Sequence, residues 1–213
     1  MSGTDNGRYC VVIPAYNSAK TIGALVRSIK HQGLPVVVIN DGSSDETAPI
    51  ASGAGAVVIS HLRNEGKGRA LRTGFEHALR AQYDGVITVD SDGQHDPAEI
   101  PELIRAGERQ HAGIVIGNRM ATATMPWARR LVNRVLSRIV STVARQPIPD
   151  SQSGFRLIRK EVLSSFPLTS QRYEIETELL LAAAKHRWKL VFVPVRTTYI
   201  NHRSHIRPVR DGL

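Results

Sequence analysis

Apolar and polar positions along this chain follow two alternating rhythms. Short runs rich in valine and isoleucine predict strands, and the segments between them carry apolar residues at helical spacing. The predicted strands of the first half cover residues 9–14, 35–40, 56–60, 85–89 and 113–117. The predicted helices between them cover residues 19–32, 45–54, 67–82 and 97–110. Strands that alternate with helices predict an α/β fold whose largely parallel sheet is covered on both faces.

The pattern changes after residue 117. The predicted elements are then a long basic helix over 127–145, a strand near 154–158, a helix near 174–186, a strand at 190–195 and a basic loop over 196–213. The chain has 213 residues, and it contains no internal repeat, low-complexity tract or obvious linker. We therefore expect a single domain with a sizeable core.

Charge adds a first indication of partners. The chain carries 28 Lys and Arg against 19 Asp and Glu, a formal net charge of +9. The excess is concentrated in residues 129–145 and 196–210. A basic surface attracts nucleotides, nucleic acids or anionic lipid, and the simpler alternative is a solvated face that aids solubility.

Three sequence features bear on the cellular compartment. The longest apolar runs, 36–39 and 179–184, are far shorter than the roughly 18 residues that a membrane-spanning helix needs. Residues 1–7 are polar and lack the apolar segment of a signal peptide. Cys10 is the single cysteine, which excludes an internal disulfide. We therefore expect a cytosolic protein.

Two carboxylates one residue apart end the predicted strand at 85–89. These are Asp90 and Asp92, and Gln94 follows two residues later. Alternation along an extended strand would turn both carboxylates the same way. In an open α/β sheet, ligands bind at the carboxyl ends of the strands. The residues therefore predict a divalent metal site and, through the metal, a phosphate site. An EF-hand is excluded, because His95 and Pro101 stand where that loop needs Gly and Glu.

Other strand ends carry polar groups toward the same edge. The first strand ends with Pro14 and Tyr16, where a base or sugar could rest, and the second ends with Asp41. The alternative for the second is an ordinary turn with Asp45 as a helix cap. Residues 64–69 match neither dinucleotide nor P-loop spacing, which argues against a dehydrogenase or kinase. Lys67 in that segment still favours an anion at a helix N-terminus.

Six short motifs follow one another along the chain: Pro14-Ala15-Tyr16-Asn17, Asp41-Gly42-Ser43-Ser44-Asp45, Gly66-Lys67-Gly68, Asp90-Ser91-Asp92-Gly93-Gln94-His95, Gly117-Asn118-Arg119 and Asp150-Ser151-Gln152-Ser153-Gly154-Phe155-Arg156. Their order resembles that of family 2 glycosyltransferases with the GT-A fold, most closely the branch of dolichol-phosphate and polyprenyl-phosphate sugar synthases. The resemblance implies one GT-A domain with a mixed, mostly parallel sheet flanked by helices. A nucleotide-binding half over 8–118 would precede an acceptor half over 119–213.

The resemblance also implies an activity, which is inverting transfer from a UDP- or GDP-linked sugar with Mg²⁺ or Mn²⁺ bridging the diphosphate. The expected nucleotide and donor contacts in the first half are Pro14, Tyr16, Asn17, Asp41, Lys67, Asp90 and Ser91. The expected metal ligands are Asp90, Asp92 and Gln94, and the expected catalytic residues are Asp92, Arg119 and Asp150. One departure is Ser18, which stands where the family often has Glu.

The nature of the acceptor decides whether a base is needed. A sugar hydroxyl requires a general base, for which Asp150, Glu174 and Glu176 are candidates, whereas a lipid phosphate is already an anion and requires cations. We expect a polyprenyl-phosphate acceptor and keep a hydroxyl acceptor, with Asp150 as base, as the alternative. A nucleic-acid-binding module is a remote third possibility, because aromatic residues make up only 5% of the chain and no RNA or DNA motif is present.

The predicted helix over 127–145 is cationic and amphipathic. Its apolar positions are Leu131, Val132, Val135, Leu136, Ile139, Val140 and Val143, and Arg130, Arg134 and Arg138 step along another face. Such a helix can lie at a membrane surface with Trp127 in the acyl boundary, or it can pack its apolar face on the protein core. The resemblance favours the membrane, because that branch places an amphipathic helix here. We expect a cytoplasmic enzyme that is peripheral on the inner face of the membrane.

The chain ends in a basic segment over 196–213. The alternatives are a disordered tail and a loop that closes over the diphosphate, as in related enzymes. Under the second alternative, Arg203 and Arg207 are the expected phosphate contacts.

Overall fold

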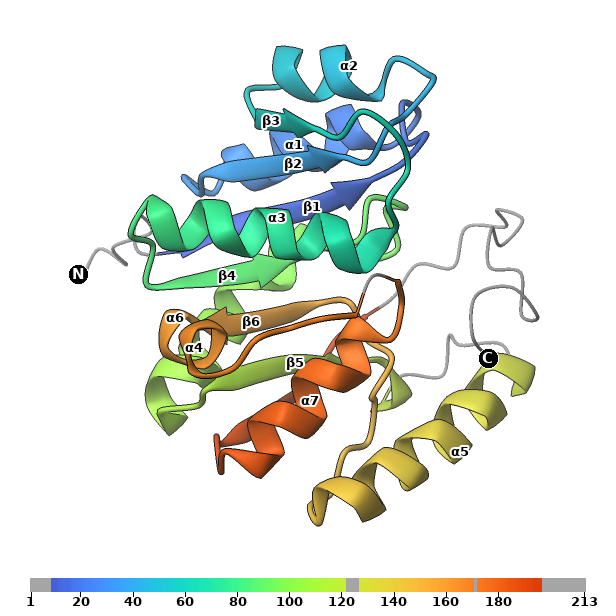
Figure 1. The fold of residues 1–213 in the computed structure, drawn as a ribbon, viewed down its shortest axis with the longest axis vertical. Coiled ribbons are helices and arrows are strands. Elements are labelled where there is room, and N and C mark those ends of the chain that lie inside the picture. The colour runs from blue at the N-terminus through green and yellow to red at the C-terminus, as the bar shows by residue number, and fades with distance from the viewer. Residues whose placement is uncertain (1–8, 122–126, 171, 197–213) are drawn as a thin grey trace.

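A seven-stranded sheet organises the protein (Figure 1). The computed structural model describes residues 9–121, 127–170 and 172–196. The strands are β1 (Tyr9–Ala15), β2 (Val36–Asn40), β3 (Val57–Ser60), β4 (Gly85–Thr88), β5 (Ile114–Asn118), β6 (Arg156–Arg159) and β7 (Leu190–Pro194). Their order is β3-β2-β1-β4-β6-β5-β7. Strand β6 runs antiparallel to β4 and β5, and the other neighbours pair in parallel. The predicted mixed, mostly parallel α/β sheet is confirmed.

Helices cover both faces of this sheet. They are α1 (Ile22–Lys30), α2 (Thr47–Gly53), α3 (Lys67–Arg80), α4 (Ile100–Gln110), α5 (Trp127–Ala144), α6 (Lys160–Ser165) and α7 (Ile175–Lys185). Helices α3 and α7 lie on the face toward the viewer in Figure 1, and α1 and α4 lie behind the sheet. Two apolar clusters correspond to these two layers, because one draws on α1, α2 and α4 and the other on α3, α6 and α7.

Strand β1 shows why the sheet needs both layers. Val11 and Ile13 belong to the cluster under α1 and α4, whereas Cys10 and Val12 belong to the cluster under α3. A strand that is buried on both faces reads as a continuous apolar run, as this one does. Burial raises the pKa of the Cys10 thiol to about 12, so the thiol stays protonated and packs as a small apolar group.

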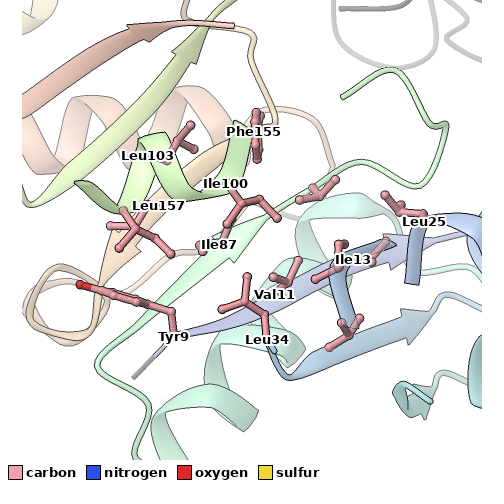
Figure 2. Packing of buried hydrophobic residues seen from close by; sticks show 14 of the residues in the cluster. Tyr9, Val11, Ile13, Leu25, Leu34, Ile87, Ile100, Leu103, Phe155 and Leu157 are labelled. Atoms are coloured by element: carbon pink, nitrogen blue, oxygen red, sulfur yellow. The ribbon is translucent and has the colours of Figure 1, made fainter. Parts of the chain in front are cut away.

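Helix α4 packs on the centre of the sheet. Figure 2 shows Ile100 and Leu103 of this helix above Ile87 of β4 and Leu157 of β6. These side chains are fully buried. The contact ties β6 into the middle of the sheet, which places the loop before β6 next to the end of β4.

Local details differ from the prediction at three places. The strand expected at 154–158 begins two residues later, at Arg156, because residues 150–154 form a loop that packs against the end of β4. Helix α6 was not expected. The helix expected from residue 97 begins as a 3-10 turn, Pro97–Glu99, before α4. The Asp96 carboxylate accepts the Ala98 N–H at 2.9 Å, which satisfies an amide at this start.

Candidate active site

A chain of alternating charges lies at the carboxyl end of β4. Asp90 follows this strand, and its Oδ1 lies 2.6 Å from the Lys67 ammonium at the start of α3. The same ammonium lies 2.6 Å from Oε1 of Glu176 in the first turn of α7. His95 Nε2 lies 3.6 Å from the other oxygen of Asp90. Lys67 therefore joins two carboxylates that come from opposite halves of the sequence.

Asp90 and Lys67 hold each other in their ionised forms. Burial alone would raise the pKa of Asp90, but the charge of Lys67 and the hydrogen bonds from His95 and Lys67 together outweigh it, so the pKa of Asp90 lies far below its usual range. Burial alone would lower the pKa of Lys67, but Asp90 and Glu176 raise it. Lys67 was predicted as a donor contact, and the structure shows it bound to Asp90 and Glu176.

Arg156 supports the far side of this chain of charges. The residue is 1% exposed, and its guanidinium donates to the carbonyls of Ser153 (2.7 Å), Glu176 (2.7 Å) and Ser151 (2.9 Å). Sequence reasoning did not single out its role. The sequence contained a signal for this role, because an arginine next to an apolar strand run can be buried only when its N–H donors have hydrogen-bond partners.

A small cavity lies between α3, α7 and strands β4 and β6. Its polar lining comes from Lys67, Asp90, Arg156 and Glu176. Leu71, Phe75 and Leu179 line its apolar side. The charged residues thus cover the apolar core at the carboxyl end of β4.

Gly154 is the point where the loop before β6 meets Asp90. The Thr88 hydroxyl donates to the Gly154 carbonyl at 2.7 Å, which draws the loop onto the end of β4. A Cβ atom on Gly154 would overlap the Asp90 carboxylate, lying 2.7 Å from Oδ1 and 2.8 Å from Cγ. The carboxylate can take this position only because the residue has no side chain.

Gly154→Ala is therefore expected to displace the Asp90 carboxylate. We expect a loss of about 1–3 kcal/mol in the free energy of unfolding, because the added methyl has no space. Urea unfolding measures this loss. Gly53→Ala is the matched control. A Cβ at this helical position meets nothing within 4 Å, and the substitution replaces a flexible glycine in α2. Equal stability of the two variants would contradict the close contact at Asp90.

Asp92 and Gln94 lie in the loop after Asp90. Asp92 is exposed, and its Oδ1 accepts the Gln94 N–H at 3.0 Å. Partial desolvation in the loop and the charge of Asp90 both raise the pKa of Asp92. Ser91, between the two carboxylates, lies 2.8 Å from the Ser18 hydroxyl, so Ser18 links the end of β1 to this loop. In the described part of the chain, no three His, Cys, Asp or Glu side chains converge as a ready metal cluster.

The residues directly after β1 lie at the same carboxyl edge of the sheet as Asp90. Tyr16 is 51% exposed, whereas Pro14 is buried inside β1. Asn17 has a positive φ of 49° and accepts the Ser44 N–H at 2.9 Å, and its own N–H donates to Ser43 at 3.0 Å. Asn17 therefore joins the loops after β1 and β2, and the neighbouring Tyr16 side chain stays exposed to solvent.

Asp41 turns away from solvent toward the loop that precedes α3. It is 3% exposed, and its carboxylate accepts the N–H groups of Glu65 (2.9 Å) and Gly66 (2.8 Å). His61 Nδ1 lies 2.7 Å from the same carboxylate, and its Nε2 lies 3.0 Å from the Thr73 hydroxyl. Asp41 was predicted as a nucleoside contact, and in the structure it organises the loop that presents Lys67.

Arg119 and Asp150 form a second ion pair beyond the end of β5. Arg119 follows β5, and its Nε and Nη2 donate to the two oxygens of Asp150 at 2.9 and 3.0 Å. The backbone N–H groups of Arg119 and Gln152 and the side-chain amide of Asn133 also donate to this carboxylate. Burial alone would raise the pKa of Asp150, but the hydrogen bonds and charge of Arg119 lower it.

Helix α5 carries its apolar side chains outward. The exposed ones are Trp127 (80%), Leu131 (55%), Val132 (52%), Val135 (50%), Ile139 (56%) and Val143 (64%). Asn133 and Ser137 on the opposite face are buried, together with Val140. The predicted amphipathic helix is present, but most of its apolar face is exposed, and only Val140 of that face is buried in the core. In Figure 1 this helix stands beside α7 at the margin of the molecule.

Arg203 and Arg207, with nearly all of the basic segment 196–213, lie outside the described residues. Among the helices of the described ranges, none combines the length and the hydropathy required to cross a bilayer.

Comparison with known proteins identifies the family. A model described as "Glycosyl transferase family 2" matches residues 10–166, well over half of the chain. The chain belongs to glycosyl transferase family 2. This family 2 protein is 32% identical over 211 residues to glycosyltransferase AglJ of Haloferax volcanii, an alignment that covers 95% of this chain and 68% of that relative.

A second relative and a solved structure agree with this assignment. A UDP-N-acetylglucosamine–dolichyl-phosphate N-acetylglucosaminyltransferase of Methanococcus voltae is 29% identical over 216 residues, which cover 90% of this chain and 86% of the relative. A crystal structure of Mycobacterium tuberculosis glucosyl-3-phosphoglycerate synthase with Mg²⁺ and UDP superposes with a TM-score of 0.74 at 21% identity. The superposition covers 92% of this chain and 73% of the synthase chain. The family 2 chain therefore has the GT-A fold and is a glycosyltransferase.

Proposed function

We propose that this family 2 enzyme transfers a sugar, with inversion, from a UDP- or GDP-linked donor to a polyprenyl phosphate at a membrane surface. The observation that carries the proposal is the Arg119–Asp150 pair. The Arg119 side chain is 14% exposed, and the Asp150 side chain beneath it is fully buried. The acceptor half therefore presents a fixed cation, which suits a phosphate acceptor. The name of the dolichyl-phosphate transferase relative supports the same substrate class.

The donor would bind along the carboxyl ends of β1, β2 and β4. Tyr16 offers an exposed ring for the base or ribose, and Asn17 and Asp41 hold the surrounding loops in place. The diphosphate would lie near Ser91 and the start of α3, where helix geometry favours an anion. Ser18, where related enzymes often have Glu, contacts Ser91 and so shapes this part of the site.

The residues present fit a divalent cation. Asp92 is an exposed carboxylate that repels the neighbouring Asp90, and Gln94 adds a neutral oxygen donor. Carboxylate and amide oxygens are the ligands that Mg²⁺ and Mn²⁺ prefer. Asp92 and Gln94 would hold the ion with Asp90, which Lys67 already neutralises in part. When bound, the ion would offset the charge that develops on the nucleoside diphosphate as it leaves.

The protein's part in the reaction is to place the two substrates. An acceptor phosphate oxygen forms a bond to C1 of the sugar while the bond from C1 to the diphosphate oxygen breaks on the opposite face. Arg119 would hold the acceptor phosphate, and its bond to Asp150 keeps the guanidinium in one orientation. A positioned bidentate arginine suits a phosphate better than a flexible cation does.

The hydroxyl-acceptor alternative requires a carboxylate that can take a proton. Asp150 is poorly suited, because it is 0% exposed and its oxygens accept hydrogen bonds from Arg119, Asn133 and Gln152. Glu176 is 7% exposed and is bound to Lys67. Glu174, the third candidate base, is exposed. The contacts of Asp150 and Glu176 favour phosphate over a hydroxyl that would use either of these two carboxylates as its base.

An acceptor screen tests the proposal. The full chain is incubated with UDP-, GDP- and dTDP-sugars and Mn²⁺, with either a polyprenyl phosphate in detergent or soluble sugars as acceptors. We expect product on the lipid phosphate with one nucleotide class and none after chelation of the metal. Transfer only to sugar hydroxyls would overturn the phosphate acceptor. The absence of thermal stabilisation by every nucleotide sugar would argue against the donor site.

Helix α5 is the proposed membrane contact. Its exposed apolar side chains lie beside arginines that can reach lipid phosphates, and Arg134 and Arg138 are exposed. An apolar face of this kind on a helix is costly in water, because nothing in the described part of the chain covers it. We propose that α5 lies in the membrane interface and brings Arg119 to the level of the lipid headgroups.

Removing the apolar face of α5 is expected to release the protein from vesicles. In a variant with Leu131, Val135 and Ile139 replaced by Ser, we expect the partition coefficient on anionic vesicles to fall about a hundredfold, because these side chains are 50–56% exposed and burying the exposed half of each contributes about 1 kcal/mol. Vesicle co-sedimentation measures the change. Val57→Ser with Leu62→Ser is the control, because these residues are 53% and 104% exposed near the opposite edge of the sheet. Equal loss in both variants would contradict docking through α5.

A further inference from the structure

The buried face of α5 carries polar side chains beside the apolar Val140, which is unusual for a helix that packs on a protein body. Asn133 and Ser137 lie one turn apart on this face and are 5% and 3% exposed. Ser141, a further turn along, is partly buried and accepts the Ile148 N–H at 2.9 Å. Buried polar groups cost free energy unless they are hydrogen-bonded, so these contacts define where the helix can sit.

Asn133 contacts the ion pair at the start of the acceptor half. Its Nδ2 donates to Oδ1 of Asp150 at 2.9 Å, the same oxygen that accepts Nη2 of Arg119 at 3.0 Å. The amide and the guanidinium thus approach one carboxylate oxygen. Oδ2 of Asp150 accepts Nε of Arg119 at 2.9 Å. The Asn133 amide therefore helps to determine the plane of the carboxylate, and that plane determines the plane of the guanidinium.

Neighbouring hydroxyls hold the Asn133 amide in the orientation that this contact needs. The Ser137 hydroxyl donates to Oδ1 of Asn133 at 3.1 Å, so the amide nitrogen points to Asp150. Ser137 also accepts the Ser151 N–H at 2.9 Å, which ties the same helix face to the residue after Asp150. The network is buried throughout, and such networks are rigid when every member has a partner.

We infer that Asn133 is a positioning residue for the acceptor: through Asp150, it orients the Arg119 guanidinium that would grip the acceptor phosphate. This inference rests on the proposed function for the role of Arg119. It also gives α5 two linked roles, because the helix that carries the proposed membrane face carries this amide on its opposite side.

Two substitutions separate positioning from packing. Asn133→Asp keeps the volume and replaces the donor by an acceptor that faces Asp150, whereas Asn133→Ala removes volume without adding repulsion. A positioning role predicts a larger effect for Asn133→Asp, and a packing role predicts a larger effect for Asn133→Ala. The matched control is Ser141→Ala, which removes a hydroxyl from the same buried face that bonds to Ile148 and not to Asp150.

Steady-state kinetics with the full chain, Mn²⁺ and a polyprenyl phosphate provide the first readout. We expect Asn133→Ala to raise the acceptor KM about tenfold, as for loss of a hydrogen bond to a charged group, and Asn133→Asp to raise it further. The donor KM and kcat are expected to stay within about twofold, and Ser141→Ala is expected to match wild type. An unchanged acceptor KM, or an equal change in donor KM, would overturn the inference.

A second readout is independent of activity. In the ¹⁵N–¹H spectrum of the arginine side chains, assigned with Arg119→Lys, we expect the Nε–H signal of Arg119 to shift or broaden in Asn133→Ala and Asn133→Asp but not in Ser141→Ala. An unchanged signal would overturn the inference. If wild type forms no lipid-linked product, the proposed function fails, and this spectrum still decides whether Asn133 orients Arg119.

Discussion

Replacing Asp92 by Asn is expected to lower the rate of sugar transfer by about a hundredfold to a thousandfold, the range seen when one group that stabilises developing charge is removed. The substitution removes a negative charge from the proposed metal site and keeps the size of the side chain. Because Asp92 is exposed, the free energy of unfolding should change by less than about 0.5 kcal/mol. Initial rates measure the loss of sugar transfer, and Mn²⁺ titration calorimetry measures the loss of metal binding.

Asp96→Asn is the control for this prediction. Asp96 is an exposed carboxylate in the same loop, and its side chain caps the turn at Pro97–Glu99. Asn preserves a cap, so this variant removes an equal charge near the site while leaving the proposed ligands in place. We expect wild-type transfer and wild-type Mn²⁺ affinity. If Asp92→Asn behaved like Asp96→Asn, Asp92 would not be a metal ligand.

Arg119→Ala is expected to have the largest combined effect on stability and transfer. It leaves the Asp150 carboxylate buried without its guanidinium partner, and breaking a buried ion pair in this way costs about 3–5 kcal/mol. Acceptor binding should be lost as well, because the proposed phosphate contact is gone. Urea unfolding and acceptor kinetics measure the two effects separately.

The double variant Arg119→Ala/Asp150→Asn separates the two roles of Arg119. Neutralising the carboxylate removes the uncompensated charge, so we expect most of the lost unfolding free energy to return while transfer stays low. Recovery of transfer in the double variant would show that Arg119 acts only by neutralising Asp150. Failure to recover stability would show that the cost has another source.

The pH dependence of Arg119→Ala follows from the same pair. In the wild type, the pKa of Asp150 is below its usual range, so the pair stabilises the folded state above about pH 4 and this contribution is lost as the pH falls through the lowered pKa. In Arg119→Ala, the buried carboxylate is stabilised by protonation. The difference in unfolding free energy between the two proteins is therefore expected to shrink as the pH falls from 7 to 4. A constant difference would contradict this assignment.

The prediction of the fold succeeded where local pattern carries the information. The runs that became β1, β2 and β4 are mostly apolar, which is typical of strands covered on both faces, and the helices between them have helical spacing. The antiparallel direction of β6 depends on how the chain returns across the sheet, which no local pattern records. The loop at 150–154 replaced the first part of this strand because the Thr88 hydroxyl donates to the Gly154 carbonyl and the Asp90 carboxylate packs closely against Gly154.

Helix α5 illustrates the same limit. The periodicity of residues 127–145 predicted a cationic amphipathic helix, and that prediction is confirmed. The periodicity alone left open which face meets the body, because hydrophobic patterning normally puts the apolar stripe inside, and only the family resemblance favoured an outward stripe. Here the buried face is held by hydrogen bonds of Asn133, Ser137 and Ser141 to residues 148–151, so most of the apolar stripe is outside.

The sequence by itself determined the α/β order of elements and the place of Asp90 and Asp92 at the end of a central strand, because periodicity and turn residues act over a few neighbours. Only the tertiary structure decided what these carboxylates contact. Lys67 reaches both Asp90 and Glu176, and Arg119 meets Asp150 across 31 positions of the chain. Such pairs form when strands distant in sequence become neighbours, and burial then makes each charge depend on its partner.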